Sequence, residues 1–391
     1  MQYLASPIAR RFPGNDGEWA RFDGPAGTQM LDSAIDALDE FAASGDNANS
    51  HGAFSASRAC DELIETSREL VAKFYRATAD GVWFGANMTT MTFAFTRAVA
   101  RALKPGDRIV GTRLDHDANV WPWHEAACEK LVEFVLAPFD AKTGRLDTEA
   151  MIDMIDERTR WVTIPGASNL IGTIPDVRAV SDAAHAVGAN VFVDAVAFAP
   201  HRQVDVMALG ADAIVSSAYK WYGPHISAMW VRPDLIESLR PFKVRPSENK
   251  GPARFETGTP NYEALAGLNA TVEFLIEFGM DAIRAVEEDT FEPLLTGLQS
   301  IPGVRCVGAQ DMVDRTPTVS FTIDGFHPDQ VAAMLAAERV AVWSGDSYAV
   351  EAGQTLGVDM TGGVVRAGVV AYVTDEDVQR LLTAVERIAS S

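Results

Sequence analysis

The fold of this chain is indicated by the sequence Ile214-Val215-Ser216-Ser217-Ala218-Tyr219-Lys220-Trp221-Tyr222-Gly223-Pro224-His225, in which an apolar strand runs into a glycine-proline turn. The strand brings one lysine, Lys220, to its carboxyl end, and α/β folds open their clefts at such ends. A lysine amine held in a cleft can bind an aldehyde covalently. The stretch therefore predicts an α/β protein with a reactive lysine, and a solvated strand-end lysine is the simpler alternative.

A second apolar strand, Asn190-Val191-Phe192-Val193-Asp194, also ends on a charged residue. Pyridoxal phosphate needs such a pair, because a lysine binds its aldehyde carbon and a carboxylate keeps its pyridine nitrogen protonated. Taken alone, Asp194 is more simply an aspartate that caps the turn after a strand. Together, Asp194 and Lys220 predict a pyridoxal-phosphate site.

Two blocks extend this prediction to a family. The block 217–224, Ser-Ala-Tyr-Lys-Trp-Tyr-Gly-Pro, is similar to Ser-Gly-His-Lys-Leu-Tyr-Gly-Pro of the cysteine desulfurase-like branch of the class V aminotransferase superfamily. The block 254–261, Arg-Phe-Glu-Thr-Gly-Thr-Pro-Asn, resembles another block of that branch. The resemblance covers nearly the whole chain. It implies the type I pyridoxal-phosphate fold, with a large domain at 18–280 and a small domain formed by 1–17 and 281–391.

Hydrophobic patterning agrees with an α/β fold. Helix-like and strand-like segments alternate, which is typical of a parallel sheet wrapped by helices. The resemblance implies a mostly parallel seven-stranded sheet and a smaller α+β C-terminal domain. The expected strands are 81–84, 108–111, 161–164, 191–194, 213–216, 318–323 and 340–343, and the expected helices are 91–103, 148–155, 177–187 and 374–388.

Composition limits the partners and the compartment. The chain has 391 residues, 47% of them hydrophobic, and a net charge of -21 from 33 basic and 54 acidic residues. Phosphate-backbone binding needs clustered Lys and Arg, so we expect neither nucleic acid nor an anionic membrane as a partner. Residues 1–7 lack the features of a secretory signal, and no apolar run is long enough to span a bilayer, so we expect a cytoplasmic protein.

The cysteines and the histidines indicate no metal site. Cys60, Cys128 and Cys306 are isolated and odd in number, so neither a disulfide framework nor a zinc site is expected. The pair His124-Glu125 lacks the spacing of a zinc protease.

A phosphate site is predicted after the strand that ends at Phe84. A small-residue turn at 85–90 leads into a helix, and a helix N-terminus offers free N–H groups to an anion, although an ordinary capped helix start is the alternative. The resemblance assigns Met88 and Thr89 to the phosphate, with Asn87 where the family has glycine. It also assigns Ser217 to the phosphate and puts Tyr219 where a histidine is usual.

The resemblance also assigns the ring and substrate contacts. Asp115-His116-Asp117-Ala118-Asn119 resembles the family's Glu-His-His-Ala-Asn, in which the first histidine stacks on the cofactor ring and exchanges protons; a loop histidine is the alternative. Asn169 matches an asparagine near the cofactor hydroxyl and the substrate carboxylate. Arg366 matches the arginine that binds the α-carboxylate, for which a guanidinium fork is suited. Thr259 corresponds to a residue that reaches the phosphate of a partner subunit, so we expect a homodimer with shared sites.

Two positions depart from the family pattern. Tyr348 stands where cysteine desulfurases carry a mobile nucleophilic cysteine that removes sulfur as a persulfide, and none of the three cysteines is near it in sequence. Ala197 stands where the family has a glutamine that bonds the cofactor's phenolic oxygen, which predicts an altered pKa of the lysine-bound cofactor. The branch is therefore expected here without its catalytic cysteine.

The favoured hypothesis is an enzyme that acts on an amino acid through a Cα carbanion, with Lys220 taking the proton and Asp194 stabilising the carbanion through the ring. We favour β-elimination or carbon–sulfur lyase chemistry, with Tyr348 as an acid or a substrate contact. An aminotransferase, an epimerase and a non-catalytic pyridoxal-phosphate carrier remain alternatives, since fold does not choose among reactions. A nicotinamide-binding domain is disfavoured because no Gly-x-Gly-x-x-Gly follows a strand. The sequence leaves open whether four tryptophans line a substrate pocket or belong to the core: Trp121, Trp123, Trp221 and Trp343.

Overall fold

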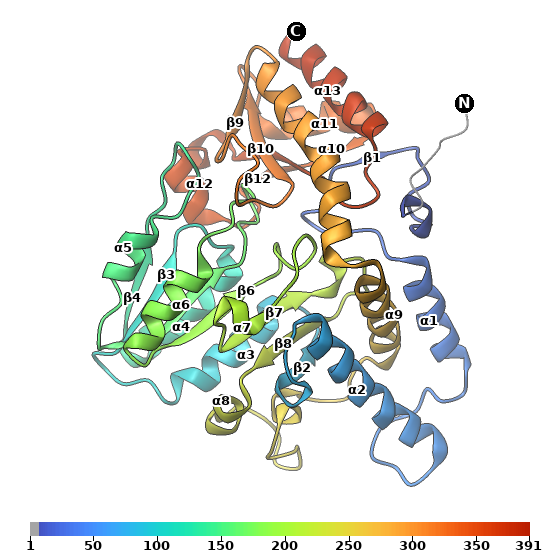
Figure 1. Cartoon of the computed structure of the whole chain (residues 1–391), viewed down its shortest axis with the longest axis vertical. Coiled ribbons are helices and arrows are strands. Elements are labelled where there is room, and N and C mark those ends of the chain that lie inside the picture. Colours follow the sequence, from blue (N-terminus) through green and yellow to red (C-terminus); the bar gives the residue numbers. More distant parts are fainter. Residues whose placement is uncertain (1–7) are drawn as a thin grey trace.

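The computed structural model describes residues 8–391, so the part of the expected small domain at 1–7 lies outside the described residues. Figure 1 shows a central sheet among helices, with the C-terminal strands and helices gathered at one end of it. The sheet has seven strands in the order β2-β8-β7-β6-β5-β3-β4. Only β8 runs antiparallel to its neighbours, which confirms the mostly parallel seven-stranded sheet. The strands are β2 (Val82–Gly85), β3 (Arg108–Thr112), β4 (Glu133–Ala137), β5 (Thr159–Pro165), β6 (Asn190–Asp194), β7 (Ala213–Ser217) and β8 (Ser227–Val231).

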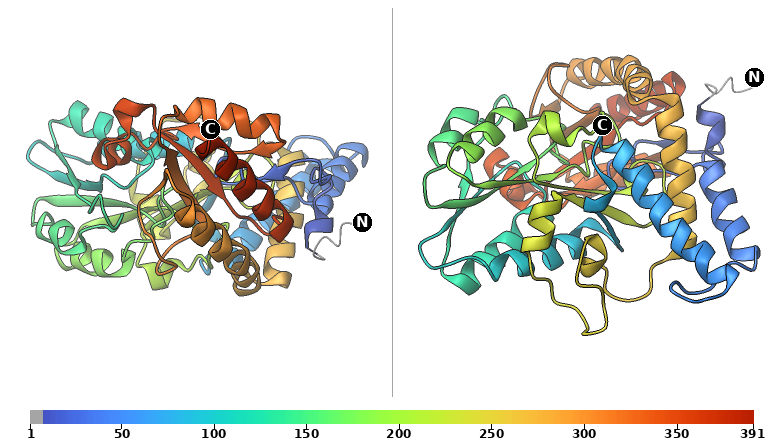
Figure 2. Two further views of the ribbon diagram at one scale, coloured as in Figure 1. Left: turned by 90° about the horizontal axis from the view of Figure 1, so that it is seen from above. Right: turned by 60° about the horizontal axis from the view of Figure 1, so that its bottom comes forward.

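Both faces of this sheet are buried, as is usual for parallel sheets, and Figure 2 shows it between two layers of helices. Side chains alternate along the strands: Phe192 and Val215 join a cluster with Phe95, whereas Val193 and Ile214 join the cluster on the other face. This alternation explains why the strand-like runs have no polar face. The helices of this domain are α2 (Ser55–Phe74), α3 (Met88–Ala100), α4 (Trp121–Lys130), α5 (Thr148–Asp153), α6 (Val177–Ala186), α7 (Val206–Leu209), α8 (Pro233–Ser238) and α9 (Tyr262–Phe278), onto which α1 (Asp32–Ala43) packs.

The C-terminal part forms an antiparallel sheet in the order β12-β13-β10-β9. Gly279, with a φ of 85°, separates α9 from the long helix that leads into this part. The N-terminal strand β1 (Ala20–Arg21) pairs with β11 and so joins the same part of the molecule. The domain limits 18–280, 1–17 and 281–391 stay a prediction. The elements are α10 (Met280–Ser300), β9 (Val304–Val307), β10 (Thr318–Ile323), α11 (Pro328–Ala337), β11 (Val340–Ala341), β12 (Trp343–Gly345), α12 (Val350–Leu356), β13 (Val364–Gly368) and α13 (Asp375–Ala389).

One expected strand is wrong as a single element. The run 340–343 contributes to two strands, because β11 pairs with β1 while β12 pairs with β13. The chain changes sheets at Val342, and such a change depends on tertiary pairing that an apolar run does not encode. The expected helix at 91–103 begins earlier, at Met88, since Asn87 caps it by accepting a hydrogen bond from the Thr90 amide at 2.9 Å.

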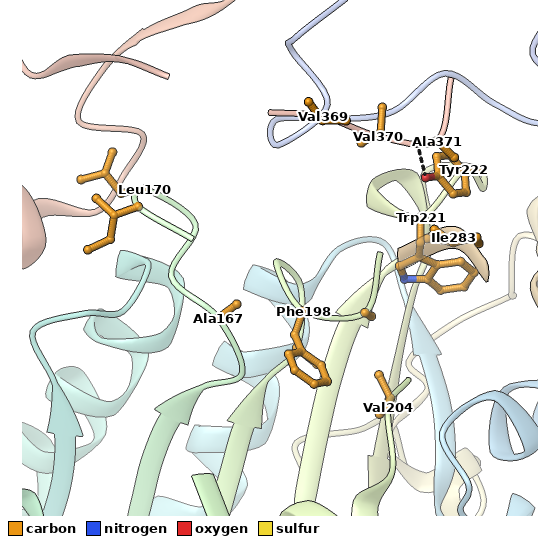
Figure 3. Close-up of a cluster of buried hydrophobic side chains, with 14 of the residues drawn as sticks. Ala167, Leu170, Phe198, Val204, Trp221, Tyr222, Ile283, Val369, Val370 and Ala371 are labelled. Carbon is orange, nitrogen blue, oxygen red and sulfur yellow. Dashed lines mark hydrogen bonds between the residues drawn. The ribbon is translucent and has the colours of Figure 1, made fainter. Parts of the chain in front are cut away.

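A buried polar group joins the segment after Lys220 to helix α10. The hydroxyl of Tyr222 donates to Glu287 Oε1 at 3.2 Å and accepts from the Ala371 amide at 3.1 Å, the bond drawn in Figure 3. The other carboxylate oxygen, Oε2, lies 2.8 Å from Nδ1 of His201. Glu287 is completely buried, so its oxygens depend on these partners.

We predict that Glu287→Ala lowers the free energy of unfolding by about 3 to 5 kcal/mol, because it leaves the buried His201 and Tyr222 groups without their acceptor. Glu287→Gln, which keeps one acceptor oxygen, should cost less. The measurement is urea unfolding, with Glu292→Ala on the exposed side of the same helix as the matched control. Equal effects of Glu287→Ala and Glu292→Ala would contradict the prediction.

Candidate active site

Lys220 ends a short helical turn that follows β7, and its amine faces the N-terminal segment of the chain. Nζ donates to the carbonyl oxygens of Pro25 at 2.6 Å and Ala26 at 2.8 Å. Burial and then the positive charge of Arg366 lower the pKa of the amine to about 7, against the opposing effect of Asp194. A substantial fraction of the amine is therefore unprotonated at neutral pH, and an unprotonated amine is nucleophilic.

Asp194 lies at the carboxyl end of β6 and is 5% exposed. Its Oδ1 accepts a hydrogen bond from the Val196 amide at 2.9 Å. Burial raises the pKa of the carboxyl to about 6, whereas the Val196 amide and Lys220 act in the opposite direction. A cationic ring nitrogen beside this carboxylate would relieve the cost of burying its charge.

His116 is a neutral imidazole at neutral pH. Its Nδ1 accepts a hydrogen bond from the Ala118 amide at 2.9 Å, which puts the ring proton on Nε2. Burial, then Lys220 and Arg366, lower the pKa of the ring to about 4. The ring thus presents an uncharged face, as stacking on an aromatic cofactor requires.

A buried network fixes the backbone that carries His116. Asn119 donates to Asp115 Oδ1 at 2.7 Å and accepts from the Thr163 hydroxyl at 2.6 Å. Asp115 also accepts from the Thr112 hydroxyl. Burial raises the pKa of Asp115 well above its usual value. The residues of the family-like pattern at 115–119 therefore fix the backbone that positions the His116 ring.

The N-terminus of α3 forms the end of the site where a phosphate was predicted. The Met88 amide donates to Ser217 Oγ at 3.3 Å, and the Ser227 hydroxyl donates to the same oxygen at 2.7 Å. Asn87 replaces the family glycine without strain, because its φ of -162° is ordinary extended backbone. The ring of Tyr219, at the usual histidine position, stacks on His225 with centroids 4.9 Å apart and planes inclined by 12°.

Arg366 on β13 is buried, and its Nη1 donates to the Asn169 carbonyl oxygen at 2.8 Å. Burial lowers the pKa of the guanidinium to about 10, so it remains positive at neutral pH. Its Nε has no hydrogen-bond partner among residues 8–391, and neither has Oδ1 of Asn169. Buried donors are rarely left unpaired, and a guanidinium N–H suits a carboxylate ligand.

The loop after β12 crosses the open side of the site. Ser347 and Tyr348 adopt left-handed backbone conformations, with φ values of 53° and 56°. The Asp117 amide donates to the Tyr348 carbonyl at 2.7 Å, and Asn169 Nδ2 donates to the Ser347 carbonyl at 2.8 Å. The Tyr348 ring lies 5.8 Å from the His116 ring, between centroids.

These groups line one cavity of about 890 Å³. Ala197 lines it too, so its methyl group stands where a glutamine donor is usual. Trp121 and Trp343 line the cavity, whereas Trp123 and Trp221 are buried in the core, which answers the question that the sequence left open. The predicted site residues that line the cavity are Met88, Thr89, His116, Asn169, Asp194, Tyr219, Lys220, Tyr348 and Arg366.

Two predicted residues lie elsewhere. Ser217 is buried beside the cavity and is linked to it through the Met88 amide. Thr259 is exposed on the loop that precedes α9 and does not line the cavity of its own chain, so its contact with a partner subunit stays a prediction. The sequence did not reveal the carbonyls of Pro25 and Ala26, because a backbone acceptor has no residue signature.

The residues present fit pyridoxal phosphate. An amine with a lowered pKa, a buried carboxylate and a helix N-terminus surround one cavity, and the unpartnered Arg366 Nε adds a place for a substrate carboxylate. None of the cavity-lining residues is a cysteine. Within 8–391, no group of three or more His, Cys, Asp or Glu could hold a metal ion. Over the same residues, no helix combines the length and the apolar character needed to cross a membrane.

Comparison with known proteins gives the family. The Aminotransferase class-V family matches residues 21–381. An uncharacterized protein of Mycobacterium tuberculosis (strain CDC 1551 / Oshkosh) is 30% identical over 98% of this chain and 99% of its own length. The "Probable cysteine desulfurase 2" of Mycobacterium leprae (strain TN) is 30% identical over 97% and 94%.

A solved structure gives the same result for the fold. The apo structure of a cysteine desulfurase from Thermococcus onnurineus NA1 superposes with a TM-score of 0.92 at 27% identity, covering 98% of this chain and 97% of that one. The type I pyridoxal-phosphate fold and the cysteine desulfurase-like relationship are thereby confirmed. This chain belongs to the class V aminotransferase family, whose enzymes depend on pyridoxal phosphate.

Proposed function

We propose that this protein is a carbon–sulfur lyase that eliminates a thiol from the β-carbon of a cysteine derivative without using a persulfide-carrying cysteine. The Cα proton leaves, the Cβ–S bond breaks with its electron pair on sulfur, and the sulfur is protonated. The remaining three-carbon fragment reacts with water to give pyruvate and ammonia. The observation that carries the proposal is the ring of Tyr348, which lies 5.8 Å from that of His116 in a cavity whose lining residues include no cysteine. The resemblance puts Tyr348 where the family has its nucleophilic cysteine.

The orientation of the substrate follows from two polar groups that have no partner in the described residues, Nε of Arg366 and Oδ1 of Asn169. Arg366 binds the α-carboxylate through its free Nε, and Nη1 stays fixed on the Asn169 carbonyl. A guanidinium that is itself held in place fixes the bound carboxylate, which orients the bonds at Cα. Asn169 Oδ1 is available to a donor on the ligand.

Proton transfer falls to Lys220 and Tyr348. When bound, pyridoxal phosphate supplies an electron-accepting ring that stabilises negative charge at Cα. Lys220, with a pKa of about 7, takes the Cα proton, and Asp194 holds a proton at the pyridine nitrogen. The phenol of Tyr348, 72% exposed at the cavity mouth, gives its proton to the leaving sulfur.

We further propose a homodimer in which Thr259 serves the partner's site. The loop that carries it is anchored by Glu256, which Arg68 holds through Nη2 at 2.8 Å and through Nη1 at 3.0 Å. Glu256 Oε1 also accepts from the Phe84 amide at 3.0 Å. Thr259 itself is exposed next to this fixed point, so its hydroxyl is available to a second chain.

The reaction class is tested by supplying L-cysteine, S-methyl-L-cysteine and L-alanine to the enzyme loaded with cofactor. We expect pyruvate and methanethiol from S-methyl-L-cysteine, with about 10²-fold or greater loss of that activity in Tyr348→Phe, because a general acid contributes at least this much. Cofactor content is the control and should be unchanged. Formation of alanine from L-cysteine with transfer of its sulfur would indicate a desulfurase. Conversion of L-alanine into a keto acid would indicate an aminotransferase, and its racemisation would indicate an epimerase. A change in the cofactor spectrum without any product would indicate a carrier.

The pH dependence of cofactor loading tests the environment of Lys220. Only the unprotonated amine reacts with an aldehyde, and a pKa of about 7 lies below the value of about 10.4 for a free lysine. The loading rate of the cofactor-free protein should therefore rise with pH up to about 7 and level off above it. Arg366→Gln removes a charge that lowers this pKa, so its plateau should begin at a higher pH. A rate that still rises steeply above pH 9 would refute the assignment.

Shared sites are tested by complementation between two variants. Lys220→Ala and Thr259→Ala subunits, co-expressed with different affinity tags and purified through both, should regain activity at limiting cofactor. One of the two sites in such a hybrid has both native residues if Thr259 acts across the interface. Hybrids no more active than the two parent variants combined would show that Thr259 does not serve the partner's site.

A further inference from the structure

The open end of the cavity combines aromatic rings with carboxylates. Trp121, Trp343 and Tyr348 line it and are 48%, 53% and 72% exposed. Asp117 and Asp346 line the same end. The mouth therefore offers polarisable faces and negative charge in one place, whereas the positive groups Lys220 and Arg366 lie in its buried part.

The separation of positive groups in the buried part from carboxylates at the mouth sets the direction in which an amino acid binds. Its α-carboxylate is held at Arg366, which is 5% exposed. Its reacting carbon lies at the amine of Lys220, also in the enclosed part. The far end of the substrate side chain must then extend toward the open mouth, between the aromatic rings and the carboxylates.

Asp117 is a carboxylate at the mouth whose negative charge has no partner in the described part of the chain. Its side chain is half-buried and has no hydrogen bond or ion pair with any of residues 8–391. Burial first, then the nearby carboxylates of Glu351 and Asp346, raise its pKa. Glu351 is paired with Arg113, and Asp346 accepts the Tyr348 amide at 2.9 Å. A positive charge beside Asp117 would relieve this unfavourable arrangement.

Contacts within the chain hold the mouth of the cavity in place. The Asp117 amide holds the Tyr348 carbonyl at 2.7 Å, and Asn169 holds the Ser347 carbonyl. The Arg113–Glu351 ion pair fixes the start of α12 against the strand end after β3. Binding here requires little loop ordering, so the charge at Asp117 acts on the substrate directly.

We propose that the substrate side chain carries a positive charge at its far end, bound by Asp117 and Asp346 and by the faces of Trp121, Trp343 and Tyr348. Aromatic faces attract an ammonium or a quaternary nitrogen, and carboxylates add to the attraction. The inference rests on the proposed function, because it takes the substrate to be a sulfur-substituted cysteine. The net charge of -21 also favours the approach of a cationic substrate.

Two other side-chain classes fit less well. An apolar chain of the same length would contact the aromatic rings but would remove water from Asp117 without supplying a partner. An anionic chain would face three carboxylates, of which only Glu351 has its own arginine. The expected order of affinity is therefore cationic, then neutral, then anionic.

The test uses three compounds that share the same scissile bond: S-(2-aminoethyl)-, S-propyl- and S-carboxymethyl-L-cysteine. Their dissociation constants for the cofactor-loaded enzyme are measured from the cofactor absorbance on rapid mixing, and pyruvate is measured separately. We expect the aminoethyl compound to bind about tenfold more tightly than the propyl compound. Asp117→Asn should reduce that ratio below threefold, whereas Asp39→Asn on the exposed side of α1, with the same change in net charge, should leave it unaltered.

The outcomes separate this inference from the reaction class. A ratio below threefold in the native enzyme overturns the cationic preference, whether or not pyruvate is formed. A preference that Asp117→Asn leaves unchanged, or that Asp39→Asn abolishes equally, also overturns it. The cationic preference with no pyruvate from any of the three compounds would overturn the lyase and retain the binding site.

Discussion

The structure depends on one buried amine. Among residues 8–391, the amine of Lys220 forms no ion pair with a carboxylate, and two backbone carbonyls, those of Pro25 and Ala26, accept its hydrogen bonds. Desolvation and then the positive charge of Arg366 lower its pKa to about 7, against the opposing effect of Asp194. Tyr222, two residues on, has a left-handed conformation with a φ of 73°; its amide donates to the Thr28 hydroxyl and its carbonyl accepts from the Leu31 amide. The N-terminal segment therefore both fixes the turn and sets the reactivity of the amine.

The site is complete only when distant segments meet. Strand ends of the large sheet supply the amine, the carboxylate and the imidazole, while β13 supplies Arg366 and the loop after β12 supplies Tyr348. Asn169 connects the two parts, since its carbonyl accepts from Arg366 and its amide group donates to Ser347. A change in the relative position of these parts would alter carboxylate binding and the cavity mouth together.

The predictable features were those with a local signature. Apolar runs at 190–194 and 213–216 predicted buried strands because both faces of a parallel sheet are covered. The family-like blocks around His116 and Lys220 then predicted part of the cavity lining, including the amine and the imidazole. The carbonyls at Pro25 and Ala26, the split of 340–345 into two strands, and the isolation of Asp117 depend on long-range contacts that leave no local pattern. The role of Thr259 remains a prediction, since a second chain is needed to observe it.

The loop with Tyr348 suggests why a tyrosine suffices there. A cysteine that carries sulfur away as a persulfide must move between its substrate and an acceptor. Here Ser347 and Tyr348 have strained left-handed backbones, each stabilised by a hydrogen bond from another segment, through Asn169 and Asp117. These two hydrogen bonds join the loop to the segments that carry His116 and Asn169. In the proposed elimination, the phenol of Tyr348 has only to give a proton to the departing sulfur, and this step requires the ring to be well positioned but does not require the loop to move.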